Sequence, residues 1–458
     1  MTTIKGRMGR ARSGRLSRFG VLVAVVAVVA LGAAPASAAN IEHFQTSGSW
    51  DEVRWDCGYP MRVVGEGSEN VVIRTDKKLD GNLFFTVNYA WAETWTTEDG
   101  RWFGLAGNGL TKDVKAKQVD GSVYAFTFHE SGQPIVVTDP SGTVIYRDRG
   151  IISFDFTIDI ATDTFEPGEL KIAAPHPLFD LDLCKAVAPI TGNDSADHLT
   201  PRPLGSTDSP MGYYEYLPPS YPDAGTGSPL LVVFNGYGEN GDGSAEALGN
   251  LLWAGIPRFI DVGGWPTDRP LVVLAAQHIE EPPGFDFSSC DGVPLGGSCN
   301  MFVQHENDHA SPAFCTTPDE VHDFIDYAVA AYDVDPSRVY VTGLSCGAFG
   351  AWEYLAKYGD EQVAAAVPIA GEGRPAWATA GCGLGSVAIW SFHGELDDVV
   401  DPQGSIAPMN DLAGCPGVTA ERAKLTVYPD LTHDGWDQAY SGSLGDDIYT
   451  WMLGFSNP

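Results

Sequence analysis

The chain has 458 residues, 44% of them hydrophobic and 11% aromatic, and its formal net charge is −33. That hydrophobic content excludes an intrinsically disordered chain, and the length indicates two or three domains of about 150 residues each. Because so acidic a surface repels phosphate groups, we expect neither nucleic acid nor a membrane as a partner.

Residues 1–38 have the pattern of a secretory signal peptide. Six basic residues and no acidic one lie between Met1 and Arg18, an apolar stretch follows over residues 19–34, and Ala36-Ser37-Ala38 supplies the small residues of a cleavage site. The alternative is a membrane anchor, but the apolar stretch is shorter than the roughly 20 residues that a spanning helix needs. We therefore expect a secreted, soluble, extracellular protein.

Residues 40–190 contain strand patterns and no convincing helical one. Turn signals of the Asp-Gly and Ser-Gly type separate runs of β-branched and aromatic residues. Residues 152–159 alternate between apolar and polar, as a half-buried antiparallel strand does. The pattern predicts an all-β accessory domain, sandwich-like, whose two ends Cys57 and Cys184 would join.

Three tryptophans, Trp91, Trp95 and Trp102, lie within twelve residues of one another in this domain. Exposed aromatic rings there could stack on the sugar rings of a polysaccharide. The other interpretation places them in the domain core, and this one is favoured because large aromatic side chains are mostly buried.

A linker is expected over residues 191–210, where proline, aspartate and serine are frequent. Beyond it, residues 211–458 alternate between short apolar strands and segments with helical spacing. Most of these strands are too continuously apolar to have one face in water, which is typical of buried parallel strands. The alternation predicts a doubly wound, mostly parallel α/β sheet.

A G-x-S-x-G motif spans Gly343 to Gly347, with Ser345 at its centre. The short apolar run of residues 338–342 leads directly into the motif, and a helical pattern over residues 348–358 leads directly out. A serine on a tight turn between a strand and a helix is a nucleophile elbow, and the helix start directs backbone N–H groups to the place where negative charge develops.

Such a serine needs an acid and a histidine farther along the chain, in that order. Asp397 follows the strand expected over residues 387–392, and His433 lies in the loop after the strand expected over residues 424–428. His433 would accept the Ser345 proton and return it to the leaving group, while Asp397 would hold the imidazole in the correct tautomer. The alternative for His433 is an ordinary surface histidine.

A glycine-rich loop, residues 235–241, follows the strand expected over residues 230–234. In an α/β-hydrolase sheet the second oxyanion donor comes from this position, so the expected oxyanion donors are the backbone N–H groups of Tyr237 and Cys346. A phosphate loop is the alternative, but the residues match neither G-x-G-x-x-G nor a Walker sequence.

Together these segments resemble the esterase and predicted-peptidase branch of the α/β-hydrolases. This branch includes secreted enzymes similar to carboxylesterases, feruloyl esterases and polyhydroxyalkanoate depolymerases. The resemblance covers residues 204–458. It implies that the aspartate of the H-G-x-x-D segment is the triad acid, which selects Asp397 over Asp398 and Asp401.

Two positions depart from that branch. Asn235 stands where the branch usually has histidine, and Cys346 stands where it usually has methionine or alanine after the nucleophile. Neither change removes a backbone N–H group, so we expect the activity to be retained.

Eight cysteines, an even number, favour disulfide bonds in an exported chain, although the sequence alone does not fix the pairing. A bond from Cys315 to Cys346 could stiffen the elbow. The other candidate pairs are Cys382 with Cys415 near the Asp397 loop and Cys290 with Cys299 in a surface loop. The absence of a C-x-x-C motif argues against a cysteine-based zinc site.

His305 to His309 matches H-E-x-x-H, the motif of zinc proteases. That motif requires a helix, whereas residues 285–317 have the composition of a long inserted loop, and no third ligand stands at a suitable spacing. The alternatives are a catalytic zinc ion, a structural cation such as calcium on Glu306 and Asp308, or a loop that overhangs the active site and selects substrates. We favour the last of these and expect neither a metal nor a cofactor.

The sequence therefore predicts a secreted serine esterase that acts through Ser345, His433 and Asp397. The expected substrates are feruloyl or acetyl esters of plant polysaccharides, or aliphatic polyesters. The alternatives are a serine peptidase with the same triad and a carbohydrate-binding protein with a vestigial hydrolase domain.

Overall fold

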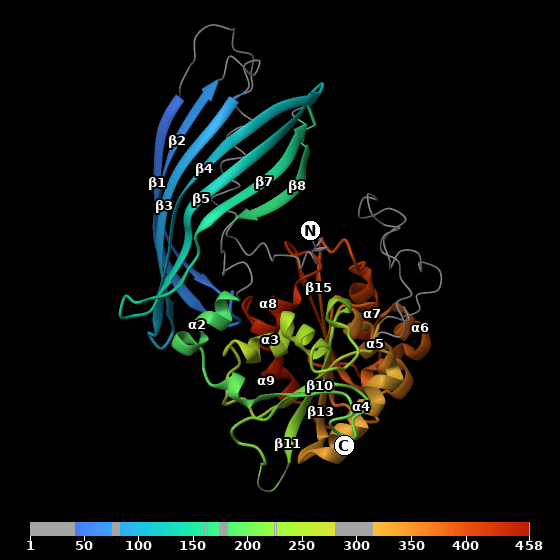
Figure 1. Cartoon of the computed structure of the whole chain (residues 1–458). Coiled ribbons are helices and arrows are strands. Elements are labelled where there is room, and N and C mark those ends of the chain that lie inside the picture. The colour runs from blue at the N-terminus through green and yellow to red at the C-terminus, as the bar shows by residue number, and fades with distance from the viewer. Residues whose placement is uncertain are drawn as a thin grey trace. The chain divides into compact units, whose positions relative to one another are not determined.

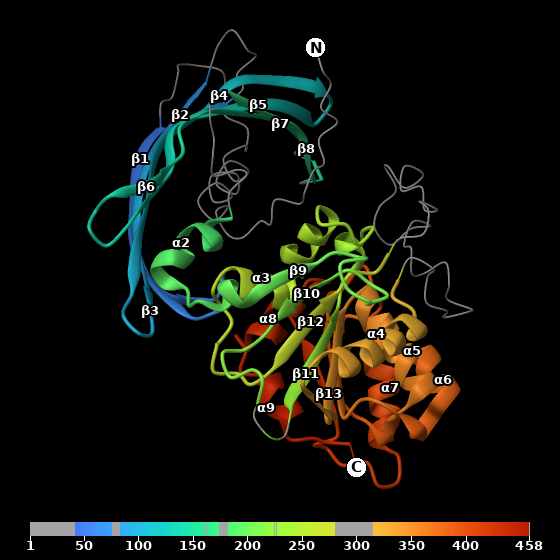
Figure 2. The ribbon, with the colours of Figure 1, turned by 60° about the horizontal axis from the view of Figure 1, so that its bottom comes forward.

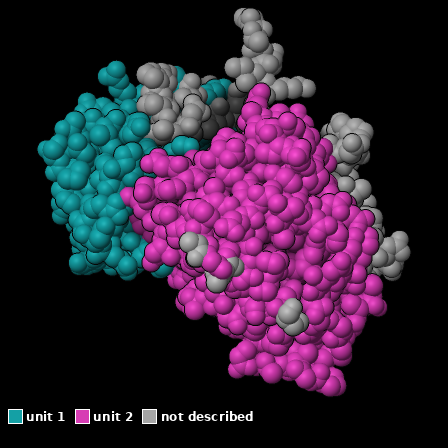
Figure 3. Space-filling view, turned by 90° about the horizontal axis from the view of Figure 1, so that it is seen from below, with its two compact units in different colours: residues 1–56, 60–191 teal, residues 57–59, 192–458 magenta. Residues whose placement is uncertain are grey.

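The computed structural model describes residues 42–75, 83–159, 161–162, 164–173, 182–223, 225, 227–279 and 315–457. The expected signal peptide, Cys290, Cys299 and the His305–His309 loop therefore lie outside the described residues. The chain forms two compact units, one extending to Thr191 and the other comprising Gly192–Pro458 together with Cys57–Tyr59 (Figure 3).

The first unit is built on one antiparallel sheet (Figure 1). Its strands are β1 (Glu42–Arg54), β2 (Met61–Thr75), β3 (Leu83–Thr97), β4 (Trp102–Asp120), β5 (Val123–Thr138), β6 (Val144–Arg147), β7 (Gly150–Asp159) and β8 (Thr164–Ala173). The order in the sheet is β1-β2-β3-β4-β5-β7-β8, and β6 pairs with β5. The predicted all-β domain is confirmed.

Within the described residues, these strands form one sheet and not the two packed sheets of a sandwich. Tight turns join β3 to β4 and β4 to β5, where Gly100 and Gly121 have φ angles of 85° and 42°. Such φ angles suit glycine, which lacks a Cβ atom. In this sheet each strand pairs with the next one along the chain, except that β7 pairs with β5 and not with β6.

The tryptophans of this unit differ in their surroundings. Trp95 is buried, its ring lies 5.7 Å from that of Phe103, and the guanidinium of Arg54 lies 4.5 Å from its centroid. The core interpretation therefore holds for Trp95, whereas Trp102 is 37% exposed.

The last residues of the unit form a short helix, which the sequence pattern did not predict. This helix, α2 (Leu183–Thr191), begins after Asp182, whose carboxylate accepts hydrogen bonds from the backbone N–H groups of Cys184 and Lys185. Such capping satisfies N–H groups that have no partner inside the helix. Cys57 and Cys184 are both disulfide-bonded.

The second unit contains a mostly parallel sheet of eight strands (Figure 1). They are β9 (Leu199–Arg202), β10 (Tyr213–Tyr216), β11 (Ser228–Phe234), β12 (Val272–Ala276), β13 (Val334–Leu344), β14 (Ala365–Ile369), β15 (Ala388–Gly394) and β16 (Ala423–Tyr428). Among the described residues the order is β16-β15-β14-β13-β11-β12-β10-β9, with the β9–β10 and β10–β12 pairs antiparallel and the others parallel. With an elbow serine after β13, this is the α/β-hydrolase fold that the sequence predicts.

The expected linker, residues 191–210, is wrong in part because it contains an edge strand of this sheet. Strand β9 pairs with β10, and Arg202 donates to the buried Glu215 at 2.7 Å. Pro201 within β9 argues against a strand when the sequence is considered alone. On a sheet edge, however, proline is tolerated, because its missing N–H group removes no hydrogen bond between strands.

Helices cover both faces of the sheet (Figure 2). One face is covered by α4 (Pro318–Ala331), α5 (Cys346–Tyr358), α6 (Arg374–Ala380) and α7 (Gln403–Ala413), and the other by α3 (Gly255–Asp261), α8 (Trp436–Ser441) and α9 (Ile448–Leu453). Among the described residues of this unit, the connections contain four 3₁₀ segments, η2 (Ser195–His198), η3 (Tyr237–Glu239), η4 (Ala247–Trp253) and η6 (Gly381–Ser386). The central strands are largely apolar because each has a helix layer on both sides.

Two disulfides join pairs of described residues within this unit. Cys315 is bonded to Cys346, and Cys382 to Cys415. Both were candidate pairs in the sequence. Within the residues that the structure covers, no helix is both long and apolar enough to cross a membrane.

Candidate active site

Ser345 lies between the last residue of β13 and the first residue of α5, in the turn that the sequence predicts. Its φ and ψ angles are 50° and −118°, a strained conformation for a residue with a side chain. The flanking glycines are required, because a Cβ atom on Gly343 would lie 2.3 Å from the Gly347 carbonyl carbon and one on Gly347 would lie 2.4 Å from the Phe234 oxygen. The turn thus holds the serine hydroxyl above the carboxyl end of the sheet.

The structure brings together the three side chains that the sequence selects. The Nε2 atom of His433 lies 3.0 Å from the Oγ atom of Ser345, and its Nδ1 atom lies 2.7 Å from Oδ2 of Asp397. Asp397 follows β15 and His433 follows β16, so parallel strands present all three at one edge of the sheet. The ring of Trp436 packs edge-on against that of His433, with 5.2 Å between centroids.

Asp397 is fixed by backbone and side-chain donors. Its Oδ1 atom accepts the N–H groups of Val399 and Val400, both at 2.9 Å, while Oδ2 faces His433. Burial raises the pKa of this carboxyl group, but hydrogen bonds from His393 and His433 lower it more, so the pKa lies well below its usual range. The carboxylate is therefore negatively charged beside the imidazole at neutral pH.

A second histidine, His393, supports the same carboxylate and was missed in the sequence. It is fully buried, with Nε2 at 3.1 Å from Asp397 Oδ2 and Nδ1 at 2.8 Å from Ser405 Oγ. Because Nε2 faces only acceptors, Asp397 and the Val400 carbonyl, it carries the proton and donates. Its place four residues before Asp397, in the H-G-x-x-D segment, is the signal that could have revealed it.

The glycine-rich loop after β11 lies directly against the elbow. A Cβ atom on Gly347 would touch the backbone of Phe234 and Asn235, and one on Gly236 would lie 2.6 Å from the Leu344 side chain. The short turn η3 begins with Tyr237, one of the two expected oxyanion donors, and α5 begins with Cys346, the other. The loop and the elbow are thus neighbours at the edge where the serine stands.

Chemically, the arrangement provides a hydroxyl group, a base beside it and a charge behind the base. A hydrogen-bonded chain from a serine through a histidine to a buried carboxylate is the arrangement that activates serine for attack on a carbonyl carbon. Among the described residues, no group of three or more His, Cys, Asp or Glu side chains is placed to hold a metal ion.

No family model and no curated protein matches the chain. Among solved structures, it is similar to a thermostable esterase, with 20% identity and a TM-score of 0.42 over 75% of this chain and 90% of the other. It is also similar to dipeptidyl peptidase 4 from Porphyromonas gingivalis, with 10% identity and a TM-score of 0.37 over 90% and 77% of the two chains.

A third similar structure is an acetyl xylan esterase from Aspergillus awamori, with 15% identity and a TM-score of 0.33 over 53% of this chain and 98% of that one. The strand order and the elbow of this chain are those of the α/β-hydrolase fold.

Proposed function

We propose that the protein is a secreted serine hydrolase that cleaves carboxylic esters. The observation that supports this proposal is the hydrogen-bonded chain from Ser345 Oγ through His433 to Asp397, with the serine on a strained elbow at the carboxyl edge of a parallel sheet. The chain needs no cofactor for this reaction.

In the proposed mechanism, His433 removes the proton from Ser345 as the hydroxyl oxygen attacks the ester carbonyl carbon. The negative charge that forms on the carbonyl oxygen is stabilised by the backbone N–H groups of Tyr237 and Cys346. His433 then protonates the departing alcohol and an acyl-enzyme forms. A water molecule, deprotonated by His433, releases the acid and restores the serine.

The proposed substrates are feruloyl or acetyl esters on plant polysaccharide, or aliphatic polyesters. These substrates suit an extracellular enzyme, because polymers of this size do not enter a cell and have to be hydrolysed outside it. Secretion itself is proposed from the sequence of residues 1–38 and predicts that the mature chain begins at Ala39. Amino-terminal sequencing of protein recovered from culture medium tests this point.

The test of the activity compares the wild-type protein with the Ser345→Ala variant on several substrates. These are p-nitrophenyl esters of short and long acids, methyl ferulate, a polyester film and casein. We expect ester hydrolysis that falls at least about 10³-fold in the variant, since removal of a triad member leaves only binding and oxyanion stabilisation. Ester hydrolysis retained within tenfold would contradict the triad, and Ser345-dependent cleavage of casein alone would make the protein a peptidase.

A further inference from the structure

The two proposed oxyanion donors come from separate loops, so other contacts must fix the positions of the two N–H groups relative to each other. An oxyanion hole works only when both N–H groups are already directed at the same point, because reorganisation during the reaction would cost free energy. The two loops touch at Gly347 and Gly236, but contact alone does not set the direction of an N–H group. That direction is set by what the rest of each peptide group binds.

The Tyr237 N–H group belongs to the same peptide group as the Gly236 carbonyl. In a planar trans peptide the C=O and N–H bonds point in opposite directions, so fixing one fixes the other. The side chain of Asn235 donates from Nδ2 to the Gly236 carbonyl oxygen at 2.7 Å and to Asn240 Oδ1 at 2.8 Å. Asn235 is only 5% exposed, so water competes little for these bonds.

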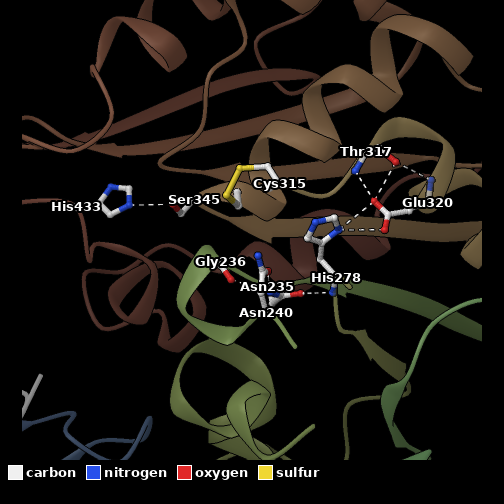
Figure 4. The surroundings of a disulfide bond; sticks show 10 residues. Asn235, Gly236, Asn240, His278, Cys315, Thr317, Glu320, Ser345 and His433 are labelled. Atoms are coloured by element: carbon white, nitrogen blue, oxygen red, sulfur yellow. Dashed lines mark hydrogen bonds and ion pairs between the residues drawn. A yellow bond between two sulfur atoms is a disulfide. The ribbon is translucent and has the colours of Figure 1, made fainter. Parts of the chain in front are cut away.

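Asn235 is itself held at its other end. Its Oδ1 atom accepts the backbone N–H group of His278 at 2.8 Å, which fixes the orientation of the amide. The imidazole Nδ1 atom of His278 lies 3.0 Å from Glu320 Oε1, and Glu320 Oε2 accepts the Thr317 N–H group at 2.8 Å (Figure 4). Thr317 caps α4, so this series of bonds leads from the oxyanion loop to the start of α4.

The Cys346 N–H group is oriented by α5 itself, and its residue is linked to the segment before α4 through the side chain. Its peptide partner, the Ser345 carbonyl, accepts the N–H groups of Ala348 and Phe349 at 2.9 and 3.1 Å. The Cys346 side chain is bonded to Cys315, two residues before Thr317. The first residue of α5 is thus joined covalently to the segment that carries the cap of α4 (Figure 4).

We propose that the segment at the start of α4, residues 315–320, fixes the geometry of the oxyanion hole. We call this segment the brace. Through Glu320 and His278 it holds Asn235, which orients the Tyr237 peptide, and through the Cys315–Cys346 disulfide it holds the Cys346 peptide. These residues are positioning residues that act through the two backbone donors. The inference rests on the proposed function, since it assigns a role only if the serine attacks a carbonyl or an equivalent centre.

The experiment compares two variants with two matched controls. The Cys315→Ala/Cys346→Ala double variant removes the bond at the brace, and Cys382→Ala/Cys415→Ala removes the other described disulfide of the same unit. Asn235→Ala removes the amide that holds Gly236, and Asn250→Ala removes an amide that donates to the Asn240 carbonyl in the same loop without contacting Gly236. Circular dichroism and thermal unfolding report whether each variant is folded.

Two readouts are used, the kcat and KM for p-nitrophenyl butyrate and the rate at which a fluorophosphonate probe labels Ser345. In the labelling step the serine oxygen forms a bond to phosphorus and fluoride leaves, so the rate does not depend on the natural substrate. We expect the two brace variants to lose about 10- to 100-fold in kcat and in labelling rate with KM changed less than about threefold, because misdirected donors weaken transition-state stabilisation. The controls should keep kcat within about twofold, even where the melting temperature falls.

The outcomes separate the two proposals. A wild-type protein that the probe does not label at Ser345 would overturn the proposed function, and the brace with it. A wild-type protein that is labelled, with folded brace variants that react as fast as the controls, would overturn the brace alone. A loss in kcat that the Cys382→Ala/Cys415→Ala control shares equally would also overturn it, since the effect would then be general destabilisation.

Discussion

The acid that orients His433 is distinguished from its neighbours by its bonds. Asp397 accepts two backbone N–H groups and faces two histidines, whereas Asp398 next to it is exposed. We predict that Asp397→Asn lowers kcat about 10⁴-fold, because the amide favours the wrong imidazole tautomer, while the protein stays folded. Asp398→Asn is the matched control and should leave kcat nearly unchanged. Equal losses in both variants, measured on p-nitrophenyl butyrate, would contradict the choice of Asp397.

The same carboxylate predicts how pH acts on the protein. The pKa of Asp397 is lowered on folding, so its charge stabilises the fold above the unfolded pKa of about 3.9 and that contribution is lost as the pH falls through the lower folded value. Between pH 7 and pH 5 the carboxylate stays charged. We expect the difference in the free energy of unfolding between the wild type and Asp397→Asn to be the same at pH 7 and at pH 5. A difference that shrinks toward pH 5 in urea titrations would contradict the lowered pKa of Asp397.

The three triad residues could be predicted because each has a signal in the sequence. Ser345 is marked by its glycines, and Asp397 and His433 by their order and by the apolar strands before them. The H-G-x-x-D segment marks the position of His393, but the hydrogen-bond partners of His393 and Asn235, such as the Val400 carbonyl and the His278 N–H group, depend on the fold. A sequence shows which residues can form hydrogen bonds, but their distant partners appear only with the fold.

Among the elements, the elbow depends on the absence of two side chains. A Cβ atom on Gly347 would meet the backbone of β11 at Phe234, which is fixed in the middle of the sheet and cannot move aside. We predict that Gly347→Ala lowers the free energy of unfolding by about 1–3 kcal/mol or more and abolishes ester hydrolysis. Gly249→Ala is the control, because a Cβ atom there meets nothing within 4 Å. Urea unfolding of both variants tests this, and equal stability would contradict the steric argument.

The elements that were predicted wrongly share one physical cause. The buried parallel strands were predictable because helices cover both of their faces and each strand is apolar in itself. Strand β9, by contrast, is polar and contains Pro201, and it is a strand only because β10 lies beside it. In the same way, the strands of the first unit form one sheet because of how successive turns direct the chain, which their residue pattern does not specify.

At the scale of the whole molecule, we expect the Cys382–Cys415 disulfide to contribute to stability but not to activity. It closes a loop of 33 residues that contains β15, Asp397 and α7. Restricting a loop of this length in the unfolded chain is worth about 3–4 kcal/mol in the chain-entropy model. We predict that Cys382→Ala/Cys415→Ala lowers the free energy of unfolding by about 2–4 kcal/mol, measured by denaturant titration.

Below its melting temperature the same variant should keep its kcat, because the local contacts of Asp397 do not pass through either cysteine. The Oδ1 atom of Asp397 is held by the backbone N–H groups of Val399 and Val400, and its Oδ2 atom by His393 and His433. None of these bonds involves the disulfide. A kcat that fell in proportion to the lost stability would mean that the loop around Asp397 is ordered by the disulfide and not by its own hydrogen bonds. The two measurements together therefore decide which of the two constraints sets the geometry of the acid.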